Sequence, residues 1–122
     1  MKKVFTLSTC TTSKLILKKA KVAELGFEIK DIKMAPITEE ELFQLRSLAG
    51  SYEALFSRRS QKYKSFGLSE KVLQEADYKD LLLSEYTFLK RPVILDGEHL
   101  FIGNSKATVE ALLRHLNLPS VL

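Results

Sequence analysis

Apolar residues near the amino terminus recur first at strand spacing and then at helix spacing. A short apolar run at 4–7 predicts a strand, and a 3.6-residue pattern at about 12–25 predicts a helix that Gly26 ends. The apolar face of this helix contains Ile16, Ala20, Ala23 and Phe27, and the opposite face contains Lys14, Lys18 and Lys21. A second strand is predicted at 28–32. Strand, helix and strand in this order predict a parallel βαβ unit.

The middle of the chain has only helical patterns. Thr38-Glu39-Glu40-Glu41 has the residue types of a capping box, which predicts a helix that turns Leu42, Leu45 and Leu48 inward and ends at Gly50. A short helical turn is predicted at 52–56, and two short helices at about 69–76 and 79–86. We therefore expect a helical insertion over about 38–86.

After this insertion the pattern returns to strands. An apolar run at 93–95, an Asp96-Gly97 turn and a second run at 99–102 predict a hairpin. Asn104 or Ser105 is placed to cap a last helix, whose apolar face contains Val109, Leu112, Leu113 and Leu116. With 122 residues and 45% hydrophobic content, the chain is long enough for one domain. The prediction is a single α/β domain with a βαβ–ββα mixed sheet, its core at about 1–35 and 88–122.

The junction of the first strand and helix holds the only cysteine, Cys10, in the polar run Ser-Thr-Cys-Thr-Thr-Ser. A helix N-terminus offers free N–H donors and a partial positive charge, which favour a thiolate over a thiol. The alternative is that Cys10 only fills space in a core, as free cysteines often do. The polar flanks favour an exposed, nucleophilic thiol.

Charge and composition restrict the possible partners. The chain has 19 basic and 15 acidic residues, a net charge of +4 and a pI near 9.2, but no run of five basic residues. This distribution indicates anionic small molecules or acidic protein surfaces rather than direct nucleic-acid binding. The apolar stretch after Met-Lys-Lys is too short for a signal peptide, and no stretch is long enough to span a membrane. We expect a cytoplasmic protein in a reducing compartment.

Neither a metal site nor a bound cofactor is predicted. Cys10, His99 in the hairpin and His115 near the end of the last helix do not have the spacing of a ligand set. The five glycines are scattered and form no phosphate-binding loop. The two histidines are expected to be an exposed strand residue and a helix C-terminal residue.

The cysteine loop, Cys10-Thr-Thr-Ser-Lys14, resembles the active-site loop of the glutaredoxin-dependent arsenate reductases and their relatives, the Spx-type regulators. The stretches at 55–60, 89–94 and 100–103 follow in the order and spacing of that family. The resemblance covers nearly the whole chain. It implies a thioredoxin-like fold with an inserted helical subdomain.

The resemblance also implies an anion site around Cys10. Arg59 and Arg91 correspond to arginines that hold an oxyanion in the family, and Arg58 fits the first position as well as Arg59 does. A forked guanidinium suits such an anion. A purely structural role as solvated basic residues remains open for Arg58 and Arg91.

Further residues of the same loop and its surroundings are candidates for binding. Ser13 and the N–H groups of the first helical turn are expected to stabilise the thiolate, and Thr12 and Ser13 are candidates for binding the anion or substrate. Lys14 is near enough to the thiol to add a positive charge. The resemblance implies a cis peptide bond before Pro92, which presents backbone to the substrate.

Two departures from the family affect the function. Ser13 stands where the redox-switching regulators have a second cysteine, so an external thiol such as glutathione, or a glutaredoxin-type partner, has to complete turnover. The arsenate reductases have a third arginine after the last strand, where this chain has Gly103-Asn104-Ser105, which weakens the expectation of arsenate as substrate; Asn104 is a further candidate site residue. The sequence predicts an arsenate reductase-like oxidoreductase acting on a small oxyanion or thiol substrate. The alternative is a non-enzymatic, Spx-like regulator that binds RNA polymerase.

Overall fold

The computed structural model describes residues 1–119, and the chain forms two compact units. The first unit contains Met1–Ala35 and the chain from Arg91 onward, and the second contains Pro36–Lys90. Among the described residues, no helix combines the length and the apolar character needed to cross a membrane.

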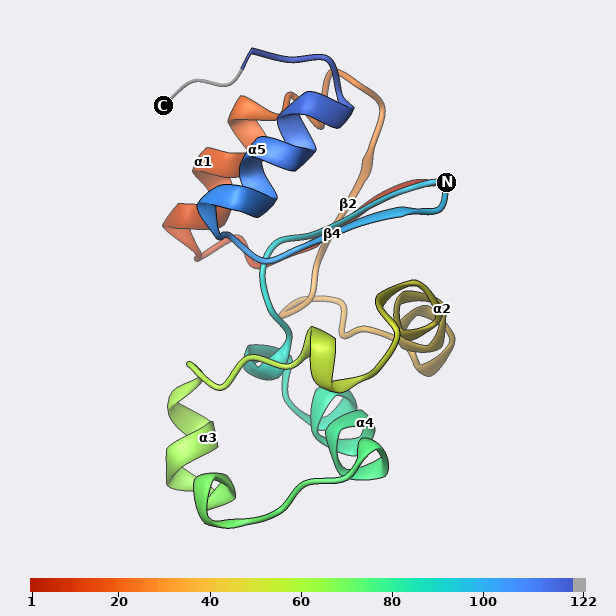
Figure 1. Ribbon diagram of the computed structural model, residues 1–122. Coiled ribbons are helices and arrows are strands. Elements are labelled where there is room, and N and C mark those ends of the chain that lie inside the picture. Colours follow the sequence, from red (N-terminus) through yellow and green to blue (C-terminus); the bar gives the residue numbers. More distant parts are fainter. Residues whose placement is uncertain (120–122) are drawn as a thin grey trace. The chain divides into compact units, whose positions relative to one another are not determined.

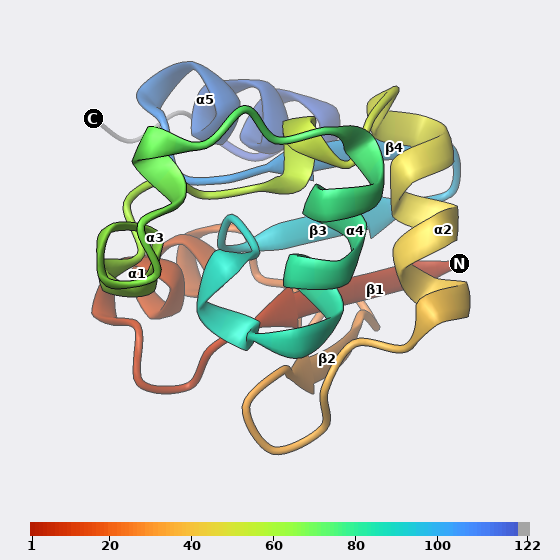
Figure 2. The ribbon, with the colours of Figure 1, turned by 90° about the horizontal axis from the view of Figure 1, so that it is seen from below.

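The first unit contains a four-stranded mixed sheet (Figure 2). Its strands are β1 (Lys2–Thr6), β2 (Glu28–Asp31), β3 (Val93–Asp96) and β4 (His99–Ile102). The spatial order is β2-β1-β3-β4; β1 and β2 are parallel, whereas β3 runs antiparallel to both β1 and β4. The predicted mixed sheet is therefore confirmed, although β1 begins and ends earlier than 4–7.

Two helices, α1 (Thr11–Lys19) and α5 (Lys106–His115), pack side by side on the sheet of this unit (Figure 1). They bury one apolar core against β1 and β3, which consists of Val4, Ile16, Ala20, Val22, Phe27, Ile94, Leu112 and Leu113. Val109 and Leu116 pack at its edge. Ser105 caps α5, because its Oγ accepts a hydrogen bond from the Thr108 N–H at 3.2 Å. The predicted apolar face of the last helix is thus confirmed.

The first helix is shorter than predicted. It ends at Lys19 rather than near Leu25, because Lys21 adopts a positive φ of 52° and the chain turns there. A series of turns then leads to Gly26, and the Val22 N–H bonds to the Leu17 carbonyl at 3.4 Å. As a result Val22 is buried and Ala23 is exposed, so Ala23 does not belong to the apolar face.

The second unit is built from helices and short 3-10 turns: α2 (Glu39–Ala49), η1 (Glu53–Leu55), α3 (Gln61–Ser65), η2 (Leu68–Glu70), α4 (Glu75–Ser84) and η3 (Tyr86–Phe88). Three details differ from the prediction. The basic stretch forms α3, which was not predicted. The helix expected at 69–76 is only the short turn η2, and the helix expected at 79–86 begins earlier, as α4 at Glu75. The cause is Gln74, whose N–H bonds to the Asp77 carboxylate at 2.8 Å and starts α4 at the next residue.

Helix α2 begins where the sequence predicted. The Glu41 N–H donates to Thr38 Oγ1 at 3.1 Å, and the Thr38 N–H donates to Glu41 Oε1 at 2.9 Å. Gly50 ends the helix in a left-handed conformation, with φ of 96°. Leu42 and Leu45 are buried, but Leu48 is 39% exposed, because it is rotated well away from Leu42 around the helix.

Aromatic residues form the centre of the second unit. The ring of Phe56, which is fully buried, lies 4.9 Å from Phe88, 5.0 Å from Tyr78 and 6.0 Å from Tyr63, measured between centroids. These rings come from α3, α4, η3 and the segment after η1. They hold together elements that are too short to be stable alone.

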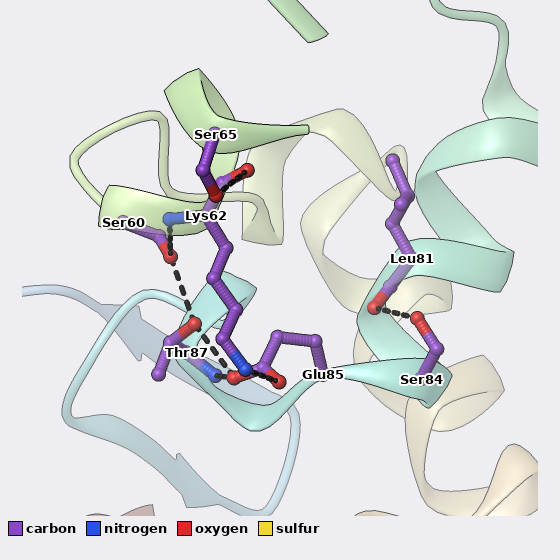
Figure 3. Close-up of polar contacts among 7 residues, drawn as sticks. All are labelled: Ser60, Lys62, Ser65, Leu81, Ser84, Glu85 and Thr87. Atoms are coloured by element: carbon purple, nitrogen blue, oxygen red, sulfur yellow. Dashed lines mark hydrogen bonds and ion pairs between the residues drawn. The ribbon is translucent and has the colours of Figure 1, made fainter. Parts of the chain in front are cut away.

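A polar network joins the start of α3 to η3 (Figure 3). Glu85 accepts hydrogen bonds from Lys62 Nζ at 2.7 Å, the Thr87 hydroxyl at 2.8 Å and the Thr87 N–H at 3.1 Å. The hydroxyl of Ser60, the N-cap of α3, lies 2.8 Å from the Thr87 hydroxyl. This network anchors the chain directly after Arg58 and Arg59.

Candidate active site

Cys10 lies between β1 and α1 and is the N-cap residue of α1. Its N–H donates to the Leu7 carbonyl at 2.9 Å, and its carbonyl accepts from the Lys14 N–H at 3.1 Å. The backbone therefore turns tightly from the strand into the helix. The thiol group is half-buried and stands at the N-terminus of the helix, as the sequence predicted.

Ser13 contacts the thiol directly. Its hydroxyl donates to Cys10 Sγ at 3.1 Å, and its side chain is fully buried. Partial burial of Cys10 by itself raises the pKa of the thiol. The hydrogen bonds from the Ser13 hydroxyl and N–H, together with the charge and a hydrogen bond of Arg91, outweigh burial, and the pKa of Cys10 lies below its ordinary value.

Arg91 reaches Cys10 through the pairing of the strands. Because Val93 of β3 pairs with Phe5 of β1 in an antiparallel register, Arg91 lies beside the point where β1 ends and the cysteine loop begins. The Arg91–Pro92 peptide bond is cis, and Pro92 is buried. The Pro92 carbonyl accepts the Gly103 N–H at 2.9 Å, which ties this segment to the end of β4. Arg91 and Cys10 thus meet within one unit.

A residue that the sequence reasoning missed supports the cysteine loop from the neighbouring strand. Asp31, the last residue of β2, accepts hydrogen bonds from Ser8 and from the Lys33 N–H, the latter at 3.1 Å. The bond from the Ser8 hydroxyl is the largest cause that lowers the pKa of this exposed carboxyl. The Ile32 N–H also donates to the Thr6 carbonyl at 2.9 Å. In the sequence, the only sign of this role was an acidic residue at the end of the strand that was predicted to lie parallel to the first one.

The remaining loop candidates are all exposed. Thr12 and Lys14 lie in the first turn of α1, and Asn104 lies between β4 and α5. Over residues 1–119, no hydrogen bond joins the side chain of Thr12, Lys14 or Asn104 to the thiol. Their roles in binding stay predictions.

The two adjacent arginines of the second unit differ in their surroundings. Arg58 donates to Glu53 Oε2 and to the Tyr78 hydroxyl, both at 2.8 Å, and the bond to Glu53 is the main cause of its raised pKa. Arg59 is exposed, and within the described part of the chain its guanidinium has no ion-pair partner. Arg58 is thus committed to its own unit, which leaves Arg59 the better candidate for an anion. Its role at the thiol stays a prediction.

The histidines lie away from this loop, at the other end of the hairpin. His115 Nε2 lies 2.9 Å from Asp96 Oδ2, and the rings of His99 and His115 are 4.5 Å apart. Across residues 1–119, no three histidine, cysteine or carboxylate side chains are arranged to hold a metal ion.

This arrangement of a cysteine loop, a cis-proline and a mixed sheet can be compared with known proteins. The model of the ArsC family matches residues 5–112. The chain belongs to the ArsC family. The arsenate reductase and Spx resemblance seen in the sequence is therefore confirmed.

Relatives within this family have different names. The global transcriptional regulator Spx of Streptococcus agalactiae is 26% identical over 111 residues, which cover 90% of this chain and 81% of that protein. The uncharacterized protein YusI of Bacillus subtilis is 34% identical over 85 residues, covering 66% of this chain and 72% of that protein. The solved arsenate reductase from Vibrio cholerae has a TM-score of 0.75 at 15% identity, with 93% and 95% of the chains covered. Like that structure, this ArsC-family chain has a thioredoxin-like fold.

Proposed function

We propose that this ArsC-family protein is a thiol-dependent oxidoreductase of the arsenate reductase type, with Cys10 as its nucleophile. The observation that carries the proposal is the thiol at the N-terminus of α1, which accepts a hydrogen bond from Ser13 and lies beside Arg91. A thiol whose pKa is lowered is present to a larger extent as the thiolate, which is the species that attacks sulfur or an oxyanion.

With an oxyanion such as arsenate, the thiolate sulfur bonds to arsenic and an oxygen leaves as water. An external thiol then attacks the Cys10 sulfur, forms a mixed disulfide and leaves the electron pair of the broken bond on arsenic, which becomes trivalent. A second external thiol releases Cys10 and carries away the disulfide. The two thiols supply both electrons. Glutathione or a glutaredoxin-type protein fits this role, because Cys10 is the only cysteine in the chain.

The positive groups hold the substrate in this proposal. Arg91 and the N–H groups of the first turn of α1 offer donors to the oxygens of the anion, and Arg59 is the second arginine. Sulfate, phosphate or arsenate is expected to bind weakly to the native protein, as measured by titration calorimetry. An Arg91→Ala protein with unchanged anion affinity would refute this placement.

The test of the oxidoreductase proposal uses Cys10→Ser. Serine keeps the size and the polar surroundings of this half-buried position, so the expected change in unfolding free energy is within about 0.5 kcal/mol. Turnover of arsenate or of a mixed disulfide with glutathione is expected to disappear, because a hydroxyl is almost wholly protonated near neutral pH. Retained turnover in a folded Cys10→Ser protein would place the chemistry elsewhere. A fall in melting temperature of more than about 8 °C would identify Cys10 as a packing residue.

A second candidate function rests on the relatives named Spx. These relatives are named global transcriptional regulators and are 26% identical over 90% of the chain, which favours a regulatory role. The partner that we propose for this role is RNA polymerase, bound without catalysis. Pull-down of purified RNA polymerase by the native protein and by Cys10→Ser distinguishes the two. Equal binding by both proteins, with no thiol-dependent turnover, would support the regulator.

A further inference from the structure

The exposed face of α1 has an unusual composition next to the reactive thiol. Ile16 and Ala20 belong to the apolar core of the first unit, and Ser13 is buried. Thr12 is exposed, and so are five residues that share one face of the helix: Thr11, Lys14, Leu15, Lys18 and Lys19. These positions follow the helical spacing of i, i+3, i+4, i+7 and i+8, so they form one continuous stripe that begins beside Cys10. We call these five residues the α1 stripe.

Charge on the α1 stripe is of one sign and unpaired. The helix contains no acidic residue, and within residues 1–119 no carboxylate pairs with Lys14, Lys18 or Lys19. The first unit as a whole has 11 Lys and Arg against 6 Asp and Glu, whereas the second has 8 against 9. The net positive charge of the protein is therefore concentrated in the unit that holds the thiol.

An apolar side chain lies between these lysines. Leu15 is the apolar member of the α1 stripe, and 56% of it is exposed. The other four residues of the stripe are polar. A lone exposed leucine is ordinary, but one set among unpaired lysines beside a nucleophile provides apolar contact area for a bound chain. Positive charge around an apolar contact fits an acidic polypeptide.

We propose that the α1 stripe docks an acidic segment of a partner protein whose sulfur exchanges with Cys10. This inference rests on the proposed function and specifies the thiol partner. In turnover, a thiolate of the partner attacks the Cys10 sulfur, a partner–S–S–Cys10 bond forms, and the electron pair of the Cys10–arsenic bond leaves with arsenic. A second thiol then attacks the partner sulfur, and Cys10 leaves as a thiolate. Because this exchange is reversible, the Cys10 thiolate also attacks the sulfur of a partner held as a mixed disulfide, and the other thiol of that disulfide leaves as a thiolate.

The length of the stripe favours a protein over a small thiol. Lys18 lies eight residues after Cys10, which is about 12 Å along a helix. An extended chain covers about 3.3 Å per residue, so a carboxylate that reaches Lys18 belongs to a residue about three or four positions from the partner's cysteine. Glutathione has only one residue on either side of its cysteine and is too short for both contacts.

The test uses two cysteine peptides activated as mixed disulfides with thionitrobenzoate. One has glutamate three and four positions from the cysteine on both sides, and the other has glutamine there. Release of thionitrobenzoate, followed by absorbance, gives the rate constant of Cys10 attack. At about 10 mM ionic strength we expect the glutamate peptide to react about fivefold faster or more, because unpaired lysines steer its approach. At about 1 M salt the ratio should approach one.

Lys18→Gln/Lys19→Gln is the test variant, because it removes two stripe charges and leaves Lys14 and the thiol in place. The expected ratio for this variant is below about two at low salt. The matched control, Lys2→Gln/Arg114→Gln, removes two exposed charges of the same unit outside α1 and should keep the native ratio. A native ratio near one, or a ratio that survives in the test variant, overturns the docking surface.

Failure of the proposed function gives a different result. The glutamine peptide reports the intrinsic reactivity of Cys10 without the charges. One outcome is that the glutamine peptide reacts with Cys10 at pH 7 no faster than it reacts with the cysteine of an unstructured peptide. In that case Cys10 is not an activated nucleophile, and both the proposed function and the docking proposal are refuted. If the glutamine peptide reacts rapidly and the glutamate peptide gains nothing, only the docking surface is refuted.

Discussion

The ionisation of Cys10 depends on a few named groups around its sulfur. Burial raises its pKa, and Ser13 and Arg91 lower it by more. Ser13 belongs to the same helix, three residues later, whereas Arg91 comes from the segment before β3. The local sequence therefore provides the helix end and the serine, and the sheet adds the charge.

Replacing Ser13 by alanine should raise the pKa of Cys10. The hydroxyl that donates to Sγ is lost, so the thiolate loses a stabilising hydrogen bond, while the fully buried position accepts the smaller side chain. We expect the midpoint of iodoacetamide alkylation to move to higher pH, and alkylation at pH 7 to become slower. Ser69→Ala, which removes an exposed hydroxyl of the second unit, should leave the alkylation curve in place. An unchanged midpoint in Ser13→Ala would assign the lowered pKa to the remaining groups.

At the scale of elements, short helices in the second unit depend on side chains that satisfy their ends. The capping box of α2 and the Glu85 network at α3 are two such devices. Each provides hydrogen-bond or ion-pair partners for backbone N–H groups and charged side chains that would otherwise have none within the fold.

Loss of the α2 cap should lower the stability of the protein by a modest, measurable amount. Thr38→Ala removes the oxygen that accepts the Glu41 N–H, and we expect a loss of about 1 kcal/mol in unfolding free energy and about 4 °C in melting temperature. Thr38→Ser keeps the hydroxyl and should stay close to the native value. Equal melting temperatures for the alanine and native proteins would mean that the cap contributes nothing to the folded state.

Glu85 should make the stability of the protein depend on pH. Burial raises the pKa of Glu85, but the bonds from Lys62 and Thr87 outweigh burial and lower it below the unfolded value of about 4.3. A lowered pKa stabilises the fold above about pH 4.3, and this stabilisation is lost as pH falls through the folded pKa. Glu85→Gln should therefore cost about 1–2 kcal/mol at pH 7, and its deficit should shrink below about pH 4.3.

Urea unfolding between pH 3 and pH 7 measures this deficit. Glu70→Gln is the control, because Glu70 is exposed in the same unit; it should stay within about 0.5 kcal/mol of the native protein at pH 7. A Glu85→Gln deficit that is constant over the whole pH range would show that the network does not depend on the charge of Glu85.

At the scale of the whole molecule, each unit has its own apolar core. The first buries helices α1 and α5 on its sheet, and the second gathers aromatic rings around Phe56. Cys10, the proposed nucleophile, lies in the first unit, shortly after β1. Arg59 belongs to the second unit and stays a predicted anion ligand.

The aromatic core of the second unit should contribute strongly to overall stability. Phe56→Ala removes a fully buried ring that contacts three others, and we expect a loss of about 3–5 kcal/mol in unfolding free energy. Phe66 is 50% exposed, and within residues 1–119 its ring packs against one other aromatic ring, that of Phe88, so Phe66→Ala should cost about 1 kcal/mol or less. Similar losses for both variants in urea titrations would argue against a core centred on Phe56.

Patterns within a few residues were enough to predict much of this protein. Alternating apolar runs and the Asp96-Gly97 turn predicted the strands, the Thr38 capping box predicted the start of α2, and the polar loop predicted Cys10 at the start of a helix. These features depend on local backbone preferences and on the neighbours of each residue along the chain. The mixed sheet followed from their order.

The features that only the tertiary structure decided depend on partners distant in sequence. The turn at Lys21 places Val22 in the core shared with α5, α3 is anchored by Glu85, and Asp31 of β2 holds the loop before Cys10. The same holds at the thiol, where Arg91 lies close because β3 pairs with β1. Local periodicity contains no information on these contacts, since each one forms only when strands or helices from separate parts of the chain meet.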